Sequence, residues 1–272
     1  MSGPSHRSDP LYLVKLGGSV ITRKRDVERA RPKILARLSE ELAAASRVRV
    51  VLLHGAGSFG HPGAKKFGLA RAPTSAQSAG ERARGAAIVT VEVRRLHLLV
   101  LRALLRAGIS PASVPIATHA RNRGGALVAF DPRPFADALA RGLTPGSFGD
   151  VVPDEEWGAS ILSADTIAEA LVEPLDADRV LFVSDVPGVL EGPPRGRRSV
   201  VRDLDEATVE RLRPSAGAVD VTGGIRGKAE AMLRIARAGA DAGLISGLSD
   251  GALSRALRGE TVYGSWAHAR SG

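Results

Sequence analysis

The sequence predicts an α/β protein: a three-layer α/β/α sandwich in which helices cover both faces of an open, mostly parallel sheet. Strand-like and helix-like segments alternate almost from one end of the chain to the other. The strand-like segments are continuous apolar runs, which is typical of strands buried on both faces. Glycine clusters follow several of these runs, at the points where a strand would lead into a helix.

The individual elements follow from hydrophobic periodicity and from the residues that end each segment. Apolar runs predict strands at residues 11–16, 48–53, 113–117, 161–162, 179–183 and 242–245. Apolar positions at helical spacing predict helices at residues 27–45, 78–107, 164–171 and 228–238. Gly108 and Gly239 stand directly after two of these helices, as glycine commonly does at a C-terminal cap. The stretch 192–198, rich in glycine, proline and arginine, predicts a mobile loop.

Length and composition are those of one globular domain. The chain has 272 residues, of which 44% are apolar and 25% charged, so a sizeable core can form. This balance excludes a disordered or fibrous protein, and the lack of cysteine excludes disulfides, a thiol nucleophile and thiolate zinc sites. We see no signal peptide and no run of about 18 apolar residues, and so expect a soluble cytoplasmic protein without a membrane partner. We expect a flexible tail at residues 1–10 and a single domain at 11–272.

The chain is strongly basic, with 38 Lys and Arg against 29 Asp and Glu and a net charge of +9. Only six of the 38 are lysines, and the arginines are scattered through alanine-rich helical stretches rather than gathered in one block. Aromatic residues make up 4% of the chain, too few for an obvious base-stacking surface. We therefore interpret the charge as a solvated basic surface that would attract a polyanionic small substrate, and expect no specific nucleic-acid partner.

Three glycine-rich segments stand where strands would lead into helices, at residues 15–19, 54–61 and 221–228. In an open α/β sheet, ligands bind at the carboxyl ends of the strands. Glycine lets backbone N–H groups approach phosphate oxygens closely, and a helix N-terminus adds its dipole. Because two of the three segments also carry a lysine, they predict a site for a phosphate-bearing ligand.

Two segments resemble well-known nucleotide-binding motifs but lack a residue or a context that each motif requires. Residues 55–60 satisfy G-x-G-x-x-G, yet the acidic residue expected about 20 positions later would be Glu81, in a helix-like stretch rather than at a strand end. Residues 223–228 are one residue short of a P-loop, and Ala229 stands where a Ser or Thr would bind magnesium. Neither a dinucleotide fold nor a P-loop is therefore expected.

The combination of motifs resembles the amino acid kinase superfamily and, within it, the isopentenyl phosphate kinases. The resemblance covers about residues 11–264 and rests on six motifs in order. They are KLGGSVIT at 15–22, HGAGSFGH at 54–61, GDVV at 149–152, ILSAD at 161–165, SDVPGV at 184–189, and DVTGG at 220–224 followed by Lys228. The chain departs from the family pattern at Arg23, Ala56, Ala164 and Ser184, and none of these changes removes a required charge. The resemblance implies transfer of the ATP γ-phosphoryl group to isopentenyl phosphate, giving the diphosphate.

The resemblance also implies roles for particular residues. Lys15 would hold the β- and γ-phosphate oxygens, Lys24 would stabilise the group in transfer, and Lys228 would bind the nucleotide phosphates from the opposite side. Asp165 would orient the lysines. The implied catalytic residues are Lys15, Lys24, His61, Asp165 and Lys228. The implied ATP-binding residues are Lys15, Gly17, Gly18, Ser19, Ala56, Asp185, Gly223, Gly224 and Lys228.

The acceptor would bind beside the second glycine segment, in a lobe of about residues 11–175, with the nucleotide in a lobe of about 176–272. His61 is the most informative residue, because an imidazole there can donate a hydrogen bond to a phosphate and gains charge beside a dianion. It favours a phosphate or phosphonate acceptor. His54 is expected to pack locally, and His119 receives no role. The implied acceptor-binding residues are Gly55, Gly60, His61, Gly149 and Asp150.

Transfer between two phosphates requires charge compensation and alignment rather than a general base. We expect a Mg²⁺ requirement, with the ion held chiefly by the ATP phosphates, because the sequence offers no compact carboxylate cage and so no protein metal site. The resemblance also implies a homodimer. Residues 87–91 and 96–101 could line a pocket for a prenyl chain, although apolar residues at helical spacing are more typical of core.

Two other functions stay open at this point. One is a kinase for fosfomycin or another small phosphonate or phosphate monoester, in the same superfamily. The other is a nucleotide-sensing or nucleic-acid-binding protein on the same fold, which the basic charge suggests. The presence of Lys15, Asp165 and Lys228 together argues against a sensor that has lost catalysis.

Overall fold

The computed structural model describes residues 9–23, 26–45, 47–75, 77–191, 199–212 and 224–269. Its helices are α1 Gly18–Ile21, α2 Pro32–Ala43, α3 Gly57–Lys66, α4 Ala79–Arg106, α5 Arg133–Ala140, α6 Ala164–Leu175, α7 Glu206–Arg211, α8 Gly224–Arg237 and α9 Ala252–Leu257, with a 3₁₀ turn η1 at Ile116–Thr118. Its strands are β1 Leu11–Leu16, β2 Arg49–His54, β3 Pro111–Ser113, β4 Ala120–Arg123, β5 Ala126–Phe130, β6 Thr144–Phe148, β7 Asp150–Asp154, β8 Gly158–Leu162, β9 Arg179–Ser184, β10 Leu190–Glu191, β11 Ser199–Val200, β12 Asp241–Ser246 and β13 Gly264–Ala267.

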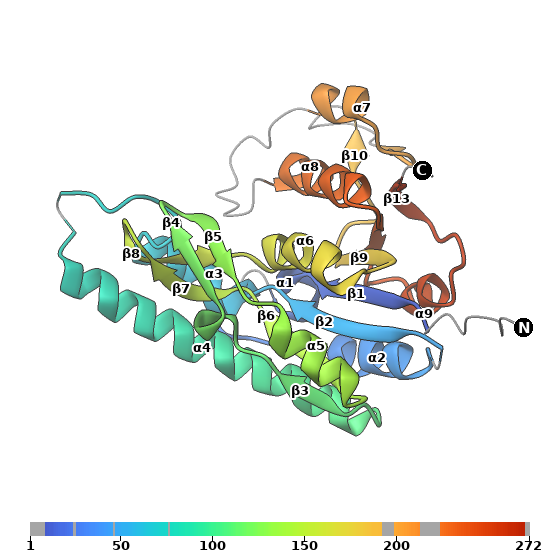
Figure 1. The fold of residues 1–272 in the computed structure, drawn as a ribbon, viewed down its shortest axis with the longest axis horizontal. Helices are drawn as coiled ribbons and strands as arrows, with labels where there is room; N and C mark the ends of the chain where they lie inside the picture. Colours follow the sequence, from blue (N-terminus) through green and yellow to red (C-terminus); the bar gives the residue numbers. More distant parts are fainter. Residues whose placement is uncertain are drawn as a thin grey trace, which may run out of the picture.

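A seven-stranded sheet in the order β13-β12-β9-β1-β2-β6-β3 forms the centre of the molecule (Figure 1). Its neighbouring strands pair in parallel except for β12 with β13. Leu16 is in register with both His54 and Val183, so β1, β2 and β9 end together at one edge. The loops that follow these strands therefore start side by side.

Helices cover both faces of this sheet, as the continuous apolar strands predict (Figure 1). Alternate residues of β1 enter two different cores. Leu11 and Leu13 pack with α5, α6 and α8, whereas Tyr12, Val14 and Leu16 pack with α2, α4 and α9. The predicted three-layer α/β/α sandwich is confirmed.

A smaller four-stranded sheet, β5-β4-β7-β8, lies over the N-terminal half of α4 (Figure 1). A third apolar cluster joins it to α3 and α4, and includes Ala64, Val89, Val93, Phe148 and Val151. This second sheet, which the sequence analysis does not anticipate, borders one end of the cavity described below.

Most predicted elements are present, with three differences. The helix predicted at 27–45 begins only at Pro32, because proline suits the first turn of a helix, whereas Val27 and Glu28 form a turn and Ala30 bridges to Thr22. The strand predicted at 113–117 is wrong: β3 ends at Ser113, and a 3₁₀ turn follows. The strand predicted at 161–162 exists as the end of β8, but it pairs antiparallel with β7 in the smaller sheet. The predicted mobile loop at 192–198 lies outside the described residues.

The long helix predicted at 78–107 is confirmed. The hydroxyl of Ser78 accepts a hydrogen bond from the backbone N–H of Glu81, whose carboxylate accepts one from the backbone N–H of Ser78. Gly108, at φ 86°, follows its end. None of the described helices is both long and apolar enough to span a membrane.

Candidate active site

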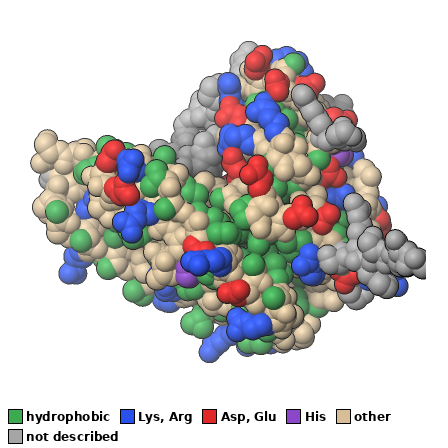
Figure 2. Space-filling model, in the orientation of Figure 1, with side chains coloured by type: hydrophobic (Ala, Val, Ile, Leu, Met, Phe, Trp, Pro, Cys, Tyr) green, Lys and Arg blue, Asp and Glu red, His purple; other side chains and the backbone are tan. Residues whose placement is uncertain are grey.

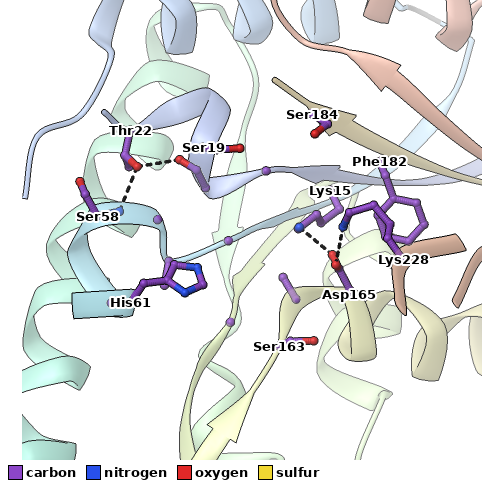
Figure 3. A pocket seen from close by; sticks show the side chains of 18 of the residues that line it. Lys15, Ser19, Thr22, Ser58, His61, Ser163, Asp165, Phe182, Ser184 and Lys228 are labelled. Atoms are coloured by element: carbon purple, nitrogen blue, oxygen red, sulfur yellow. Dashed lines mark hydrogen bonds and ion pairs between the residues drawn. The ribbon is translucent and has the colours of Figure 1, made fainter. Parts of the chain in front are cut away.

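A cavity of about 580 Å³ opens at the edge where β1, β2 and β9 end (Figure 3). Residues of all three glycine segments line it. So do the predicted site residues that fall within the described ranges: Lys15, Gly17, Gly18, Ser19, Gly55, Ala56, Gly60, His61, Gly149, Asp150, Asp165, Asp185, Gly224 and Lys228. Lys24 and Gly223 lie outside the described residues. The fold therefore gathers into one cavity residues that are spread over most of the chain.

Four helices begin at this cavity. Gly18, Gly57, Ala164 and Gly224, the first residues of α1, α3, α6 and α8, all line it. The first N–H groups of a helix have no partner within the helix and carry a partial positive charge. Their convergence makes the cavity suited to a polyanion even before any side-chain charge is counted.

Two lysines meet on one carboxylate inside the cavity (Figure 3). Lys15 Nζ lies 2.6 Å from Asp165 Oδ1, and Lys228 Nζ lies 2.5 Å from Asp165 Oδ2. The Lys228 ammonium also lies 5.1 Å from the centre of the Phe182 ring. We call this arrangement the Lys–Asp–Lys cluster; its side chains are between 10% and 15% exposed, so water screens it weakly.

Local structure explains why these three side chains meet. Lys15 is in register with Phe182 of β9 and, like Leu11 and Leu13, points to the face that α6 and α8 cover. Ser163 caps α6 by accepting a hydrogen bond from the N–H of Thr166, which places Asp165 in the first turn of that helix. Lys228 projects from the first turns of α8, so two helix N-termini and one strand end share a single charge cluster.

The cluster shifts the ionisation of its members. Burial alone would raise the pKa of the Asp165 carboxyl, but the charges of Lys15 and Lys228 outweigh burial and hold that pKa well below its usual range. Burial lowers the pKa of the Lys15 ammonium, which Asp165 opposes only in part and the neighbouring Lys228 reinforces. A phosphate that enters beside the lysines supplies the negative charge that this cluster lacks.

The first two glycine segments pack directly on each other. A side chain on Gly55 would place its Cβ 2.8 Å from the backbone nitrogen of Gly18, and one on Gly18 would overlap the backbone of Gly57. Gly57 has φ 50°, a conformation that favours glycine. Glycine at these positions is therefore required for the close approach of the two loops.

Three hydrogen bonds hold the loops around the cavity. Thr22 Oγ1 donates to the carbonyl of Gly18 at 2.6 Å and accepts from the N–H of Ser58 at 3.0 Å, which joins the first segment to the second. Ser19 Oγ donates to Asp185 Oδ1 at 2.7 Å, which joins the first segment to the end of β9. The role of Thr22 escapes the sequence analysis, although its place at the end of the KLGGSVIT motif is a signal.

The end of the cavity away from the Lys–Asp–Lys cluster is bordered by α3, α4 and the smaller sheet. The His61 ring points into the cavity from α3 (Figure 3). Asp150 also lines this end; its side chain is fully buried, and its Oδ2 lies 3.3 Å from an Nη of Arg94. Burial raises the pKa of Asp150 to about 6, against the opposing effect of Arg94.

The same end carries an apolar wall formed by Ala64, Val89, Val93 and Ile161. Of the two segments considered for a prenyl pocket, only Val89 of 87–91 lines the cavity, whereas Ile88 and Val91 face solvent. In the second segment Leu96 belongs to the core, and Leu98 and Leu99 are exposed. Helical spacing alone does not reveal which face of α4 turns toward the cavity. Val93, one turn beyond Val89, also lines the cavity and lies outside both predicted segments.

The other two histidines considered in the sequence analysis, His54 and His119, differ in their surroundings. His54 is buried and packs locally, as predicted, with its ring against His97 and Phe148. His119 follows η1 and does not line the cavity.

Comparison with known proteins agrees with this geometry. The family model described as the amino acid kinase family matches residues 10–245. The chain is 33% identical to an isopentenyl phosphate kinase of Methanothermobacter thermautotrophicus, over 93% of this chain and 97% of that protein. It is 34% identical to an isopentenyl phosphate kinase of Thermoplasma acidophilum, over 83% and 86% respectively.

A solved isopentenyl phosphate kinase structure superposes with a TM-score of 0.82 at 29% identity, covering 94% of this chain and 99% of that one. The resemblance inferred from the six motifs is thereby confirmed. With a family model that spans most of its length and relatives aligned nearly end to end, this chain belongs to the amino acid kinase family.

Proposed function

We propose that the protein transfers the γ-phosphoryl group of ATP to the phosphate of isopentenyl phosphate, forming isopentenyl diphosphate and ADP. The observation that carries this proposal is one cavity with two unlike ends. One end holds the Lys–Asp–Lys cluster among helix N-termini, and the other holds His61 beside an apolar wall. A phosphate ester with a short hydrocarbon chain would place its phosphate near the lysines and its chain against the apolar wall. The relatives named as isopentenyl phosphate kinases support the same substrate.

The chemistry needs alignment and charge compensation. An oxygen of the acceptor phosphate attacks the γ-phosphorus, the bond from that phosphorus to the β,γ-bridging oxygen breaks, and ADP leaves with the electron pair. An ionised phosphate is already a nucleophile, so no side chain has to remove a proton. In this proposal Lys15 and Lys228 neutralise the charge on the ATP phosphates, and Asp165 fixes both ammonium groups. Lys24 keeps its sequence-based role of stabilising the transferring group.

The two substrates approach from opposite sides within this proposal. Residues about 11–175 contribute α3, α4 and the smaller sheet, which would hold the acceptor against Gly55, Gly60, His61, Gly149 and Asp150. Residues about 176–272 contribute β9, β12 and α8, which would hold the nucleotide together with the loop after β1. Of the tail predicted at residues 1–10, only Asp9 and Pro10 are described, and neither lines the cavity.

Magnesium fits this arrangement as a partner of the nucleotide. In the described ranges, no group of three or more His, Asp or Glu side chains could hold a metal ion. Asp165 is already engaged by two lysines. We therefore propose that Mg²⁺ binds chiefly through the ATP phosphates, where it would neutralise part of their charge.

The basic charge serves as a solvated surface in this proposal. Arginines pair with neighbouring acids at several places, for example Arg234 with Glu169 and Arg123 with Glu155. Figure 2 shows basic and acidic side chains interspersed on the face drawn. Such a surface does not favour a specific nucleic-acid partner. A soluble phosphate ester and ATP as substrates favour a cytoplasmic enzyme.

A direct test is an ATP-consumption assay with six acceptors: isopentenyl phosphate, dimethylallyl phosphate, fosfomycin, carbamate, acetylglutamate and uridine monophosphate. We expect the highest kcat/KM for isopentenyl phosphate, because Val89 and Val93 place apolar side chains beside the acceptor. A higher kcat/KM for fosfomycin or for a non-phosphate acceptor would overturn the proposal.

His61→Ala is expected to raise KM for isopentenyl phosphate and to lower kcat, with KM for ATP unchanged. A hydrogen bond to a charged group contributes about 1.5–3 kcal/mol, or about tenfold to a hundredfold in kcat/KM. His61→Gln should recover part of the loss, since an amide can still donate to the phosphate. If the alanine variant weakens only ATP, the two substrates lie in the opposite order from the one proposed.

We further propose a homodimer formed through the outer face of α4. Ile88, Val91, Leu98 and Leu105 follow one stripe of this helix and are 39%, 57%, 54% and 60% exposed. Spacings of three and seven residues keep them on one side, away from the core residues of the same helix. Exposed apolar side chains along one side of a long helix suit the same side of a second copy across a two-fold axis.

The double substitution Leu98→Glu and Leu105→Glu is expected to yield monomers, because it places four carboxylates in the two-fold interface. The mass is measured by size-exclusion chromatography with light scattering. Val128→Glu introduces the same charge at an exposed apolar position of β5 and should leave the dimer intact. A monomeric wild-type protein, or a dimeric double variant, would contradict this interface.

A further inference from the structure

Two buried histidines outside the cavity lie in a chain of hydrogen bonds that runs from the exposed Ser113 to a cavity-lining loop. His54 Nδ1 lies 3.2 Å from the carbonyl oxygen of Gly55, and His54 Nε2 lies 3.0 Å from His97 Nδ1. His97 Nε2 lies 2.9 Å from Ser113 Oγ. The two histidines are 1% and 4% exposed and pack against the fully buried ring of Phe148.

The partners determine the direction of this chain when both rings are neutral. A carbonyl oxygen only accepts, so His54 Nδ1 must carry a proton and donate to Gly55. The Nε2 atom of a neutral His54 then accepts from His97 Nδ1, which leaves His97 Nε2 to accept from the hydroxyl of Ser113. Every ring nitrogen is satisfied in this one arrangement.

The surroundings favour the neutral rings. Burial lowers the pKa of His54 to about 4 and that of His97 to about 3. The charged groups that act on the pair are Lys15 from β1, which lowers the pKa of His54, and Arg94 from α4, which lowers that of His97. Arg94 is paired in turn with Asp150 at the start of β7.

The chain connects α4 and β3 to two loops of the cavity. The Gly55 carbonyl that it holds belongs to the residue before Ala56, the N-cap of α3. The carbonyl of His54 itself accepts from the N–H of Gly149 at 3.0 Å. Gly55 and Gly149 both line the cavity.

We propose that the Ser113–His97–His54 hydrogen-bond chain is a positioning device that fixes the Gly55 carbonyl and thereby the acceptor side of the cavity. Its members touch neither substrate. The chain acts through the loop that leads into α3, so its loss should affect acceptor binding more than ATP binding. This assignment of the acceptor side rests on the proposed function, whereas the direction of the hydrogen bonds does not.

His97→Phe keeps a ring in the core but removes the donor to His54 and the acceptor for Ser113. We expect KM for isopentenyl phosphate to rise about fivefold, the worth of one neutral hydrogen bond, with KM for ATP unchanged. His97→Gln should restore most of the loss, because its amide can donate to His54 and accept from Ser113. His268→Phe serves as the matched control and should behave as wild type, because His268 is exposed and takes no part in the hydrogen-bond chain.

A folded His97→Phe protein with wild-type KM for the acceptor would overturn the positioning role. The role would also be overturned if His97→Phe and His97→Gln both lowered the melting temperature while the KM values for the acceptor and for ATP stayed unchanged. These kinetic measurements assume that isopentenyl phosphate is the acceptor. If the wild-type protein does not phosphorylate it, the proposed function is wrong, and that result is distinct from a failure of the positioning role.

Nitrogen-15 NMR of the wild-type protein tests the chain independently of any acceptor or variant. We expect His54 and His97 both to be protonated at Nδ1 and unprotonated at Nε2 at neutral pH. A proton on Nε2 of either ring, or a cationic ring, would overturn the proposed direction of the hydrogen bonds.

Discussion

Lys15→Ala and Lys228→Ala are each expected to lower kcat by about 10²–10³-fold while the protein stays folded, because each removes an ammonium group that, in the proposed mechanism, stabilises the negative charge of the ATP phosphates during transfer. The two ammonium groups converge on Asp165 from β1 and α8, inside a cavity where little water screens them. Steady-state kinetics with ATP and isopentenyl phosphate measure the loss, and circular dichroism verifies the fold.

Lys33→Ala is the matched control, since Lys33 is exposed on α2 and does not line the cavity. Lys15→Arg and Lys228→Arg should recover only part of the rate, because a planar guanidinium does not reproduce the position of a compact ammonium group. A folded Lys15→Ala protein with near-normal turnover would eliminate the proposed mechanism. Equal losses in kcat for Lys33→Ala would show that the effect is not specific to the cluster.

Asp165→Asn is expected to destabilise the protein by about 3–5 kcal/mol near neutral pH, because it leaves two buried ammonium groups without their shared countercharge. Turnover should fall as well, since both lysines lose the group that fixes them. Urea unfolding of the ligand-free protein measures the free energy, and the loss should shrink when ATP and Mg²⁺ are added, because phosphates then neutralise the lysines.

The pH dependence of this difference gives a second test. The pKa of Asp165 is lower in the folded protein than in the unfolded chain, because the two lysines outweigh the effect of burial. Its stabilising contribution is therefore fully present above the unfolded pKa of about 4 and is lost as pH falls through the folded pKa. Wild type and Asp165→Asn should thus converge in stability in acid. Asp131→Asn, at the exposed pair with Arg133, should change stability little at any pH. If the free energies of unfolding of wild type and Asp165→Asn differed by a constant amount as the pH falls below about 4, the ionic role of Asp165 would be contradicted.

The sequence by itself determined the fold class and the chemistry of the cavity. Continuous apolar runs report burial on both faces, so β1, β2, β9 and β12 could be predicted from the local pattern alone. Glycine clusters at the ends of such runs predict where backbone N–H groups can meet phosphates. Lys15 and Lys228 stand beside two of these clusters, so their place at the site also follows from a short stretch of sequence.

Only the tertiary structure decided which distant residues meet. Nothing local in the sequence shows that Lys15 and Lys228 share one carboxylate, or that His54 and His97 join in one hydrogen-bond chain, because such contacts depend on the order of strands and on how helices cross them. The same limit explains the strand wrongly predicted at 113–117, since an apolar run does not reveal whether a neighbouring strand is there to pair with it. Helical spacing likewise marks α4 as amphipathic, but packing against α3 and the smaller sheet turns Val89 and Val93 into the cavity and leaves Ile88 and Val91 in solvent.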